Sequence, residues 1–172
     1  KRDIENLLHL LQNKEVNTTM ANNKVKDVAV NRKARHDYFL EESYECGLVL
    51  TGTEIKSIRM GKVQFKDAYI SIYKGEAYIK GMHISHYALG TFSNVDEERD
   101  RKLLLHKEEI RKLDSKVRLK GYTLVPTRMY LKDGRAKLEI ALARGKDLYD
   151  KRQTEKQRDM SREIAKAMKV RG

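Results

Sequence analysis

The strongest local constraint on the fold lies in residues 121–143, where two apolar runs flank an Asp-Gly pair. Apolar side chains at every second position of residues 136–142 indicate a strand with one buried face. Asp133 and Gly134 favour a tight turn, because both of its central residues need a positive φ. Residues 121–143 are therefore predicted to form a β-hairpin. Pro126, the only proline in the chain, has no N–H to donate, so we expect it at a sheet edge or a bulge.

The segment from residue 44 to residue 59 has the pattern of a strand, a turn and a short helix. Residues 44–50 alternate between apolar and other side chains, as a strand with two distinct faces does. Gly52 can adopt the positive φ of a sharp turn, and Thr53 is the expected N-cap of the helix. Glu54 lies where the positive end of the helix favours a carboxylate. The helix should carry its cationic side chains to one edge of a β core.

Two other regions complete the expected order of elements. Alternation within residues 66–87 predicts a second hairpin, which turns at residues 74–76. Residues 93–113 predict a longer helix, since acidic residues lie early and basic residues lie late. The sequence therefore predicts a mainly β fold with flanking helices: an OB-like antiparallel β-barrel plus a basic C-terminal tail.

The charge balance indicates a polyanionic partner. Lys and Arg number 37 against 25 Asp and Glu, which gives a net charge of +12 in a chain of 172 residues. Such an excess favours nucleic acid or an anionic membrane as the partner. No apolar run approaches the ~20 residues that a membrane-spanning helix needs. We therefore expect a nucleic-acid-binding protein with no membrane partner, present as a monomer in the cytoplasm.

Catalytic and metal-binding patterns are missing from the sequence. Cys46 is the only cysteine, which excludes an internal disulfide and a Cys-based zinc cluster. We find no phosphate-binding glycine loop and no paired-His helix, and His83 and His86 lack further ligands in a defensible metal set. We therefore expect no enzymatic activity, no cofactor and no metal.

A cationic cluster precedes the first aromatic residues of the β region. Its members are Asn31, Arg32, Lys33, Arg35 and His36. Cationic groups beside aromatic rings suit nucleic acid, because charge holds phosphates while rings and amides contact bases. A solvated segment leading into a strand is the simpler alternative.

The last part of the chain, residues 144–172, has no β pattern. It contains ten Lys or Arg against five Asp or Glu, a local net charge of +5. On a helix, four cations would share one face: Arg158, Arg162, Lys166 and Lys169. The accompanying apolar stripe is too thin to stabilise an isolated helix of this length. We expect a tail that is disordered in the free protein and helical on an RNA surface.

Four motifs in order give the chain a resemblance to a known family. They are residues 31–39, 45–59, 101–107 and 145–152, and they span the chain from about residue 24 to its end. The chain resembles the SsrA-binding proteins, also called small protein B, which escort transfer-messenger RNA to stalled bacterial ribosomes. The resemblance implies the same barrel with a basic tail. Four ordered motifs are far more specific than any one of them.

The resemblance also implies roles for individual residues. It places Asn31, His36, Glu45 and Leu104 in contact with transfer-messenger RNA. It places the junction of barrel and tail at the ribosomal decoding centre, with the tail in the empty mRNA channel. The junction residues are Gly145, Lys146, Tyr149, Asp150, Lys151 and Arg152. Many relatives carry histidine where this chain has Tyr149, and either ring can stack on an unpaired base.

We expect three parts in the chain. Residues 1–23 form an N-terminal extension outside the core, residues 24–144 form the RNA-binding barrel, and residues 145–172 form the tail. The expected function is to bind transfer-messenger RNA (the SsrA RNA) and deliver it to stalled ribosomes for trans-translation, with the tail in the decoding site. The alternative is a generic ribosomal or single-strand RNA-binding OB module. Residue chemistry supports both almost equally, and only the ordered motifs separate them.

Overall fold

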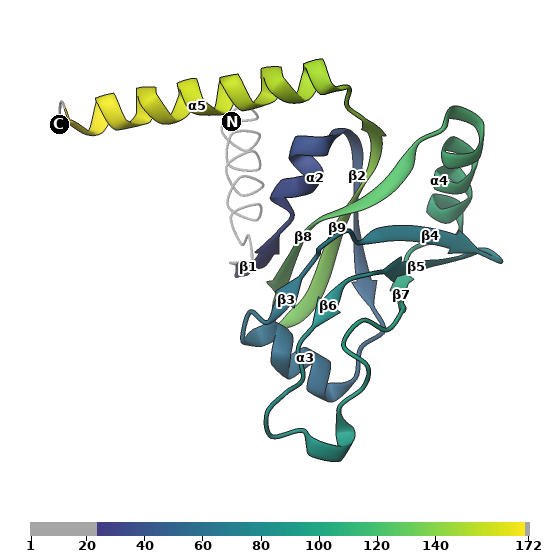
Figure 1. The fold of residues 1–172 in the computed structure, drawn as a ribbon. Helices are drawn as coiled ribbons and strands as arrows, with labels where there is room; N and C mark the ends of the chain where they lie inside the picture. The colour runs from purple at the N-terminus through teal and green to yellow at the C-terminus, as the bar shows by residue number, and fades with distance from the viewer. Residues whose placement is uncertain (1–23, 171–172) are drawn as a thin grey trace, which may run out of the picture.

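The computed structural model describes residues 24–170 (Figure 1), so the predicted extension at residues 1–23 lies outside the described residues. The elements, in chain order, are β1 (Val25–Val30), α2 (Arg32–Asp37), β2 (Tyr38–Leu48), α3 (Gly52–Arg59), β3 (Val63–Gln64), β4 (Tyr69–Tyr73), β5 (Glu76–Lys80), β6 (His83–Ile84), the 3-10 turn η1 (Thr91–Ser93), β7 (Arg101–Leu104), α4 (Lys107–Lys120), β8 (Thr123–Lys132), β9 (Arg135–Gly145) and α5 (Leu148–Val170).

The strands close into a ring. They pair in the order β8, β4, β5, β7, β2 and β9, and β9 pairs again with β8. Strand β1 extends the pairing of β8, and β3 and β6 form a separate two-stranded sheet. All of these pairs are antiparallel. The prediction of an OB-like antiparallel β-barrel with flanking helices is therefore confirmed.

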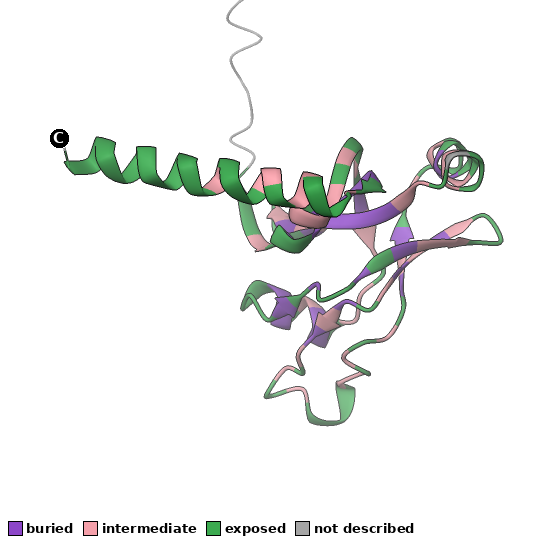
Figure 2. Ribbon diagram, turned by 45° about the horizontal axis from the view of Figure 1, so that its top comes forward, coloured by how far each residue is buried: buried purple, intermediate pink, exposed green. Residues whose placement is uncertain are grey.

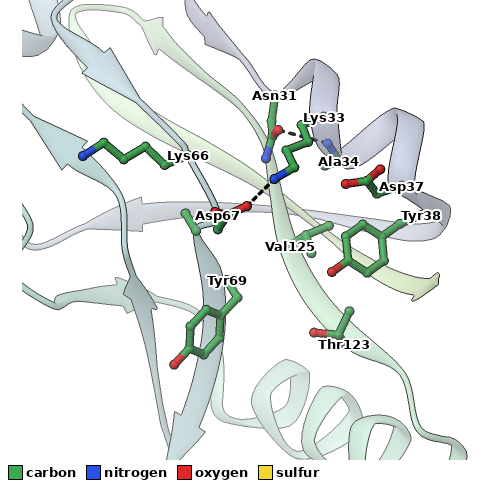
Figure 3. Close-up of a pocket in the computed structure, with 11 residues that line it drawn as sticks. Asn31, Lys33, Ala34, Asp37, Tyr38, Lys66, Asp67, Tyr69, Thr123 and Val125 are labelled. Carbon is green, nitrogen blue, oxygen red and sulfur yellow. Dashed lines mark hydrogen bonds and ion pairs between the residues drawn. The ribbon is translucent and has the colours of Figure 1, made fainter. Parts of the chain in front are cut away.

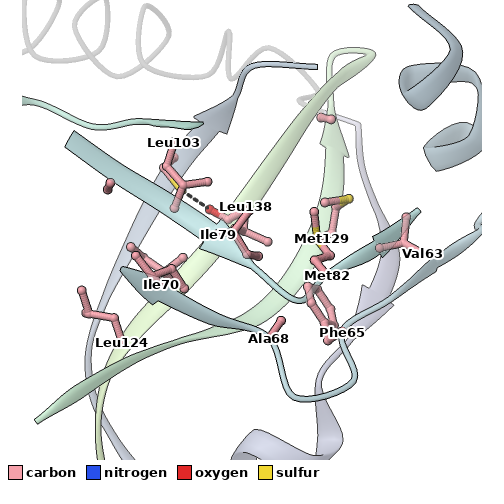
Figure 4. Packing of buried hydrophobic residues seen from close by; sticks show 14 of the residues in the cluster. Val63, Phe65, Ala68, Ile70, Ile79, Met82, Leu103, Leu124, Met129 and Leu138 are labelled. Atoms are coloured by element: carbon pink, nitrogen blue, oxygen red, sulfur yellow. Dashed lines mark hydrogen bonds between the residues drawn. The ribbon is translucent and has the colours of Figure 1, made fainter. Parts of the chain in front are cut away.

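The main core fills the ring, and a smaller cluster lies outside it. Core side chains from different strands meet inside the barrel (Figure 4), among them Ile79, Leu103, Met129 and Leu138. The outer cluster joins Ala34 of α2 to Val125 of β8 and Ala143 of β9. Helix α2 is thus packed on the outer face of the sheet, whereas most of the α5 surface is exposed (Figure 2).

Both predicted hairpins are present. Asp133 and Gly134 have φ values of 51° and 77° at the turn between β8 and β9. Lys74 and Gly75 have φ values of 48° and 74° at the turn between β4 and β5. Positive φ at two successive residues produces a turn whose twist matches that of the flanking strands. The register of β8 shifts just after Pro126, so the proline lies at a bulge as predicted.

The helix predicted over residues 93–113 is wrong in its first part. Residues Arg101–Leu104 form β7, which pairs with β5 on one side and β2 on the other. These partners are distant in sequence, so a local charge pattern does not reveal the strand. Helix α4 begins only at Lys107, and Gly121 follows its last residue with a φ of 64°.

The predicted start of α3 is also wrong. Thr51, and not Thr53, is the N-cap, and Gly52 is the first helical residue with no positive φ. Thr51 Oγ1 accepts a hydrogen bond from the Glu54 backbone N–H, and the Glu54 carboxylate accepts one from the Thr51 N–H. This reciprocal capping box satisfies two backbone donors at once, which a cap at Thr53 would not do.

No helix within residues 24–170 is long and apolar enough to cross a membrane. No three His, Cys, Asp or Glu side chains in the same range gather into a group that could hold a metal ion.

Candidate RNA interface

The predicted cationic cluster forms helix α2, which its residue pattern alone does not indicate. Asn31 Oδ1 accepts a hydrogen bond from the Ala34 backbone N–H at 3.0 Å, which makes Asn31 the N-cap. Its Nδ2 donates to the backbone oxygen of Pro126 at 2.8 Å, and the residue is only 7% exposed. The structure thus uses the Asn31 amide to anchor α2 on β8. Direct contact of Asn31 with RNA stays a prediction.

The other cations of α2 are open to solvent. Arg32 and Arg35 are exposed, and neither forms an ion pair within the described residues. Lys33 pairs with Asp67 across a cleft of about 330 Å³ between α2 and the start of β4 (Figure 3). The two side chains are 61% and 84% exposed, so water competes with the pair and it contributes little to stability. Lys33 is therefore available to exchange Asp67 for a phosphate.

His36 joins α2 to the tail helix. Its Nδ1 lies 2.8 Å from an Asp37 oxygen, and its Nε2 lies 2.7 Å from an oxygen of Glu155 in α5. Lys151 of α5 adds a longer ion pair to Asp37, at 3.7 Å. A residue predicted to contact RNA is thus occupied inside the protein: Asp37 of α2 engages one of its ring nitrogens, and docking of α5 engages the other.

This contact makes the docking of α5 dependent on pH. Hydrogen bonds to Asp37 and Glu155 raise the pKa of His36 above its ordinary value of 6.5. A group with a raised pKa stabilises the docked state fully below the ordinary pKa, and this stabilisation is lost as pH rises through the raised pKa. We expect the docked fraction of α5, followed by amide chemical shifts, to fall as pH is raised from below the ordinary pKa of 6.5 through the raised value.

The control for this prediction is His36→Gln, in which the pH dependence should flatten. The neighbouring charged groups are Asp37, Glu155, Lys151 and Lys33. His36→Gln leaves all four of these groups in place, so any pH dependence that remains in the variant belongs to them and not to the imidazole. Equal docking of the wild-type tail at both ends of the range would contradict the prediction.

A second group of predicted residues meets on the outer face of the sheet. In the ladders of β2, Gly47 lies opposite Leu104 of β7 and opposite Lys137 of β9. Glu45 is two residues from Gly47 and therefore points to the same face. Leu104 is 55% exposed, and a Cβ added at Gly47 would lie 3.3 Å from Leu104 Cδ1. The glycine leaves room for the leucine beside Glu45.

Lys137 is a member of this face that the sequence analysis missed. Its charge helps to lower the pKa of Glu45. The signal that could have found it is the alternation along β9, where Leu138 is in the core and Lys137 points outward. The same alternation puts Ala143, which packs under α2, on the face of Lys137. Helix α2 and the group formed by Glu45, Gly47, Leu104 and Lys137 (the Glu45 group) thus lie along one outer face of the sheet.

Glu45 is held by two neighbours from β8. Its carboxylate accepts a hydrogen bond from the Tyr130 hydroxyl and lies 3.4 Å from Lys132 Nζ. The Tyr130 hydrogen bond lowers the pKa of Glu45, which keeps the carboxylate ionised. The side chain remains 41% exposed, so it can also accept a hydrogen bond from a base or a ribose.

We predict that Glu45→Ala weakens binding to transfer-messenger RNA by about tenfold, equivalent to one lost hydrogen bond to a charged group. Tyr130→Phe is the matched control, because it removes the internal hydrogen bond and keeps the carboxylate. Both variants should unfold a few degrees below wild type, and only Glu45→Ala should lose RNA affinity in a filter-binding titration. Equal affinity losses in the two variants would assign Glu45 a purely internal role.

The junction of barrel and tail is tied to α2. Gly145 ends β9 opposite Tyr38. Lys146 donates its backbone N–H to Asp37 O at 2.9 Å, and its Nζ donates to Arg35 O at 3.2 Å and to Thr154 Oγ1 at 3.1 Å. Lys146 is therefore engaged inside the protein. Tyr149, in contrast, is 71% exposed, which leaves its ring free to stack.

The rest of α5 projects from the body (Figure 2) and buries no residue. Of the predicted cationic face, Arg158 is half-buried and Arg162, Lys166 and Lys169 are exposed. At the start of the helix, Asp150 is half-buried and Arg152 is exposed. The tail is helical from Leu148 to Val170. Disorder of the free tail and all of the residue roles at the ribosome stay predictions.

Comparison with known proteins identifies the family. The SmpB protein family matches residues 28–170, which include both the barrel and α5. An SsrA-binding protein of Ruminiclostridium cellulolyticum is 55% identical over 150 residues, 87% of this chain and 97% of the relative. One from Thermoanaerobacter pseudethanolicus is 53% identical over 150 residues, 87% of this chain and 96% of the relative.

A solved structure is also similar to this chain. It is described as "tmRNA-SmpB: a journey to the center of the bacterial ribosome", and it matches with a TM-score of 0.60 and 49% sequence identity. The match covers 70% of this chain and 85% of the solved chain. These findings confirm the resemblance carried by the four ordered motifs. The chain belongs to the SmpB protein family.

Proposed function

We propose that this protein binds transfer-messenger RNA and delivers it to stalled bacterial ribosomes for trans-translation. The observation that carries the proposal is the family match, which runs through the barrel and into α5 without leaving out either part. The similar proteins are SsrA-binding proteins, and the similar solved structure is of tmRNA-SmpB and the bacterial ribosome. The net charge of +12 fits an RNA partner.

In this proposal, the barrel and helix α5 bind different partners. The outer face of the barrel, with α2 at one end and the Glu45 group at the other, binds transfer-messenger RNA. Helix α5 occupies the decoding site and the mRNA channel, where Tyr149 stacks on an unpaired base and the exposed cations hold phosphates. The exposure of these side chains supports this division.

The test is to identify the RNA that the protein retains in a bacterial lysate. The full chain is captured on a resin, and the bound RNA is eluted and sequenced. One abundant, structured small RNA would support the proposal, whereas a mixture of RNAs would favour a generic RNA-binding module. The eluted RNA is also incubated with the protein and Mg²⁺, because turnover would indicate an enzyme.

Binding should depend strongly on salt. Each phosphate neutralised by Lys or Arg releases counterions, so the slope of log affinity against log salt is about 0.7–0.9 per contact. With three or more contacts, affinity should fall roughly 20-fold or more between 50 and 200 mM salt. Arg32→Gln should reduce the slope by about one contact. A flat response between these salt concentrations would contradict phosphate contacts as the main source of affinity.

A further inference from the structure

The cleft between α2 and the start of β4 (Figure 3) is formed by two fixed walls. Its volume of about 330 Å³ lies at the lower end of the range for small-ligand pockets, which suits a single nucleoside. On one wall, α2 is anchored by the Asn31 amide and by the packing of Ala34 on Val125. On the other wall, Ala68 belongs to the barrel core. The cleft therefore exists before a ligand enters it.

The interior of the cleft offers aromatic rings and hydroxyl groups. Tyr38 comes from the end of α2 and Tyr69 from the start of β4, so the two rings line opposite walls, with Val125 between them (Figure 3). Thr123 adds a third hydroxyl. Within residues 24–170, none of these three hydroxyls forms a hydrogen bond. Rings of this kind stack on a base, and hydroxyls donate to or accept from a base edge or a ribose.

The mouth of the cleft carries one cation and one anion, the ion pair between Lys33 and Asp67. The Ala68 N–H donates to Phe65 O at 2.8 Å, which closes the tight turn that places Asp67 at the mouth. Lys66 in this turn has a φ of 47°, a conformation that is retained only where the surrounding structure fixes it. A nucleotide can satisfy both members of the pair, because it has an anionic phosphate for the lysine and base N–H donors for the aspartate.

The other charged groups that line the cleft are already neutralised. Asp37 contacts His36 at 2.8 Å and Lys151 at 3.7 Å, and Lys66 forms an ion pair with Glu98. The exposed arginines of α2 give the surroundings a cationic surplus. A phosphate at the mouth therefore displaces only one carboxylate, that of the ion pair there. Because this carboxylate then loses its partner, the ligand has to supply new donors to it.

We propose that this cleft holds one unpaired guanosine of transfer-messenger RNA. The base lies between Tyr38 and Tyr69. Its N1–H and N2–H donate to the Asp67 carboxylate, and the adjoining phosphate contacts Lys33. Guanine is the base with two adjacent N–H donors on one edge, and a carboxylate presents two acceptor oxygens to such an edge.

The choice of partner rests on the proposed function. Helix α2 forms one wall of the cleft, and it also lies at one end of the outer face that binds transfer-messenger RNA in that proposal. A guanosine in the cleft would thus belong to the same RNA as the segment on the outer face. Cations beside the cleft hold the backbone that leads to this nucleotide.

The sign of the effect at Asp67 separates recognition from a passive role. Removing a carboxylate from a surface that faces a polyanion strengthens binding, unless the carboxylate accepts a hydrogen bond from the ligand. Asp67→Asn should therefore weaken binding of the transfer-messenger RNA transcript about 5-fold or more in a filter-binding titration. Unchanged or stronger binding by this variant would overturn the proposal.

Asp100→Asn is the matched control. Asp100 is another exposed aspartate, and it pairs with Lys80 at 3.4 Å outside the cleft. Its substitution removes the same charge from the protein, so it should not weaken binding of the transcript. An equal loss of affinity in Asp100→Asn and Asp67→Asn would overturn the proposal, because the effect would then not depend on the cleft.

A charge exchange distinguishes nucleotide recognition from a clamp between the two walls. The double variant Lys33→Asp with Asp67→Lys keeps an ion pair at the mouth but places each charge on the opposite wall. It should bind the transcript at least as weakly as Asp67→Asn. Its unfolding temperature should stay close to that of the wild type, because the pair is exposed to solvent. Wild-type affinity of the double variant would show that the pair only joins the walls, and would overturn the proposal.

Interference mapping identifies the guanosine. Inosine, which lacks the N2 amine of guanosine, replaces a small fraction of the guanosines in the transcript, and each inosine is marked by a phosphorothioate that iodine cleaves. The RNA bound by the wild type and by Asp100→Asn should be depleted of inosine at one unpaired guanosine. The RNA bound by Asp67→Asn should not be depleted there. The same pattern with all three proteins would overturn the proposal.

The wild-type titration separates this proposal from the function on which it rests. Failure of the wild type to bind the transcript would count against the proposed function itself. Binding by the wild type with an interference pattern that Asp67→Asn leaves unchanged would keep the proposed function and reject only the guanosine site.

Discussion

A chain that ends at Lys146 will bind transfer-messenger RNA with nearly unchanged affinity but will no longer support tagging of stalled peptides. Helix α5 buries no residue, so its removal takes nothing from the core of the barrel. Ending the chain at Lys146 keeps the last strand pair, Tyr38 with Gly145, and the hydrogen bond from the Lys146 N–H to Asp37 O. The barrel should therefore unfold at close to the wild-type temperature.

Affinity is measured by filter binding, and tagging is measured by trans-translation on ribosomes stalled without a stop codon. The control is a full-length chain in which Arg158, Arg162, Lys166 and Lys169 are all changed to Gln. If cationic contacts in the mRNA channel are the role of the tail, the control should lose most of its tagging activity while keeping its affinity. Normal tagging by the shortened chain would show that α5 has no essential role.

Glu54→Ala will destabilise the barrel by about 3–5 kcal/mol, because it leaves a buried cation without its partner. Glu54 is 4% exposed, and its carboxylate lies 2.7 Å from Arg101 Nε and 2.7 Å from Arg99 Nη2. The Arg101 side chain is fully buried and then retains only backbone oxygens, those of Met82, Glu97 and Arg99, as acceptors. The same change removes the capping box of α3.

Burial alone would raise the pKa of Glu54, but hydrogen bonds from Arg99, Thr51 and Arg101 outweigh it, so the pKa is lowered. The stabilisation is therefore present at neutral pH and is lost only as pH falls through the lowered pKa. Thermal unfolding at neutral pH should show a drop on the order of 10 °C for Glu54→Ala.

Glu76→Ala is the matched control, because the Glu76 carboxylate pairs with Lys102 at the same distance of 2.7 Å but is 45% exposed. Solvent screens this surface pair, so its loss should barely change the unfolding temperature. Equal effects of the two substitutions would mean that burial of Arg101 does not govern the stability of this network.

Local chemistry made part of the fold predictable. The turn at Asp133-Gly134, the bulge after Pro126 and the exposed cationic face of the tail depend on neighbours within a few residues. A turn follows from the φ that two adjacent residues tolerate, and a strand face follows from alternation. The ordered family motifs identified the family for the same reason, since each is a short stretch of sequence.

Pairing across long sequence separations was decided only by the tertiary structure. Leu104 lies in a strand and not in the predicted helix, because β7 gains ladders from both β5 and β2. Pairing with two neighbouring strands outweighs the local propensity of these residues, so propensity did not determine their conformation.

In the candidate site, too, contacts between residues distant in sequence could not be predicted from local patterns. The sequence by itself determined that a cationic cluster, an acidic residue at Glu45 and a basic tail exist. It did not determine that His36 bonds Glu155 of the tail, that Tyr130 holds Glu45, or that Glu54 neutralises Arg101. Each of these contacts joins elements far apart in the chain and depends on which face of a strand or helix meets another. That geometry exists only after the ring of strands has closed.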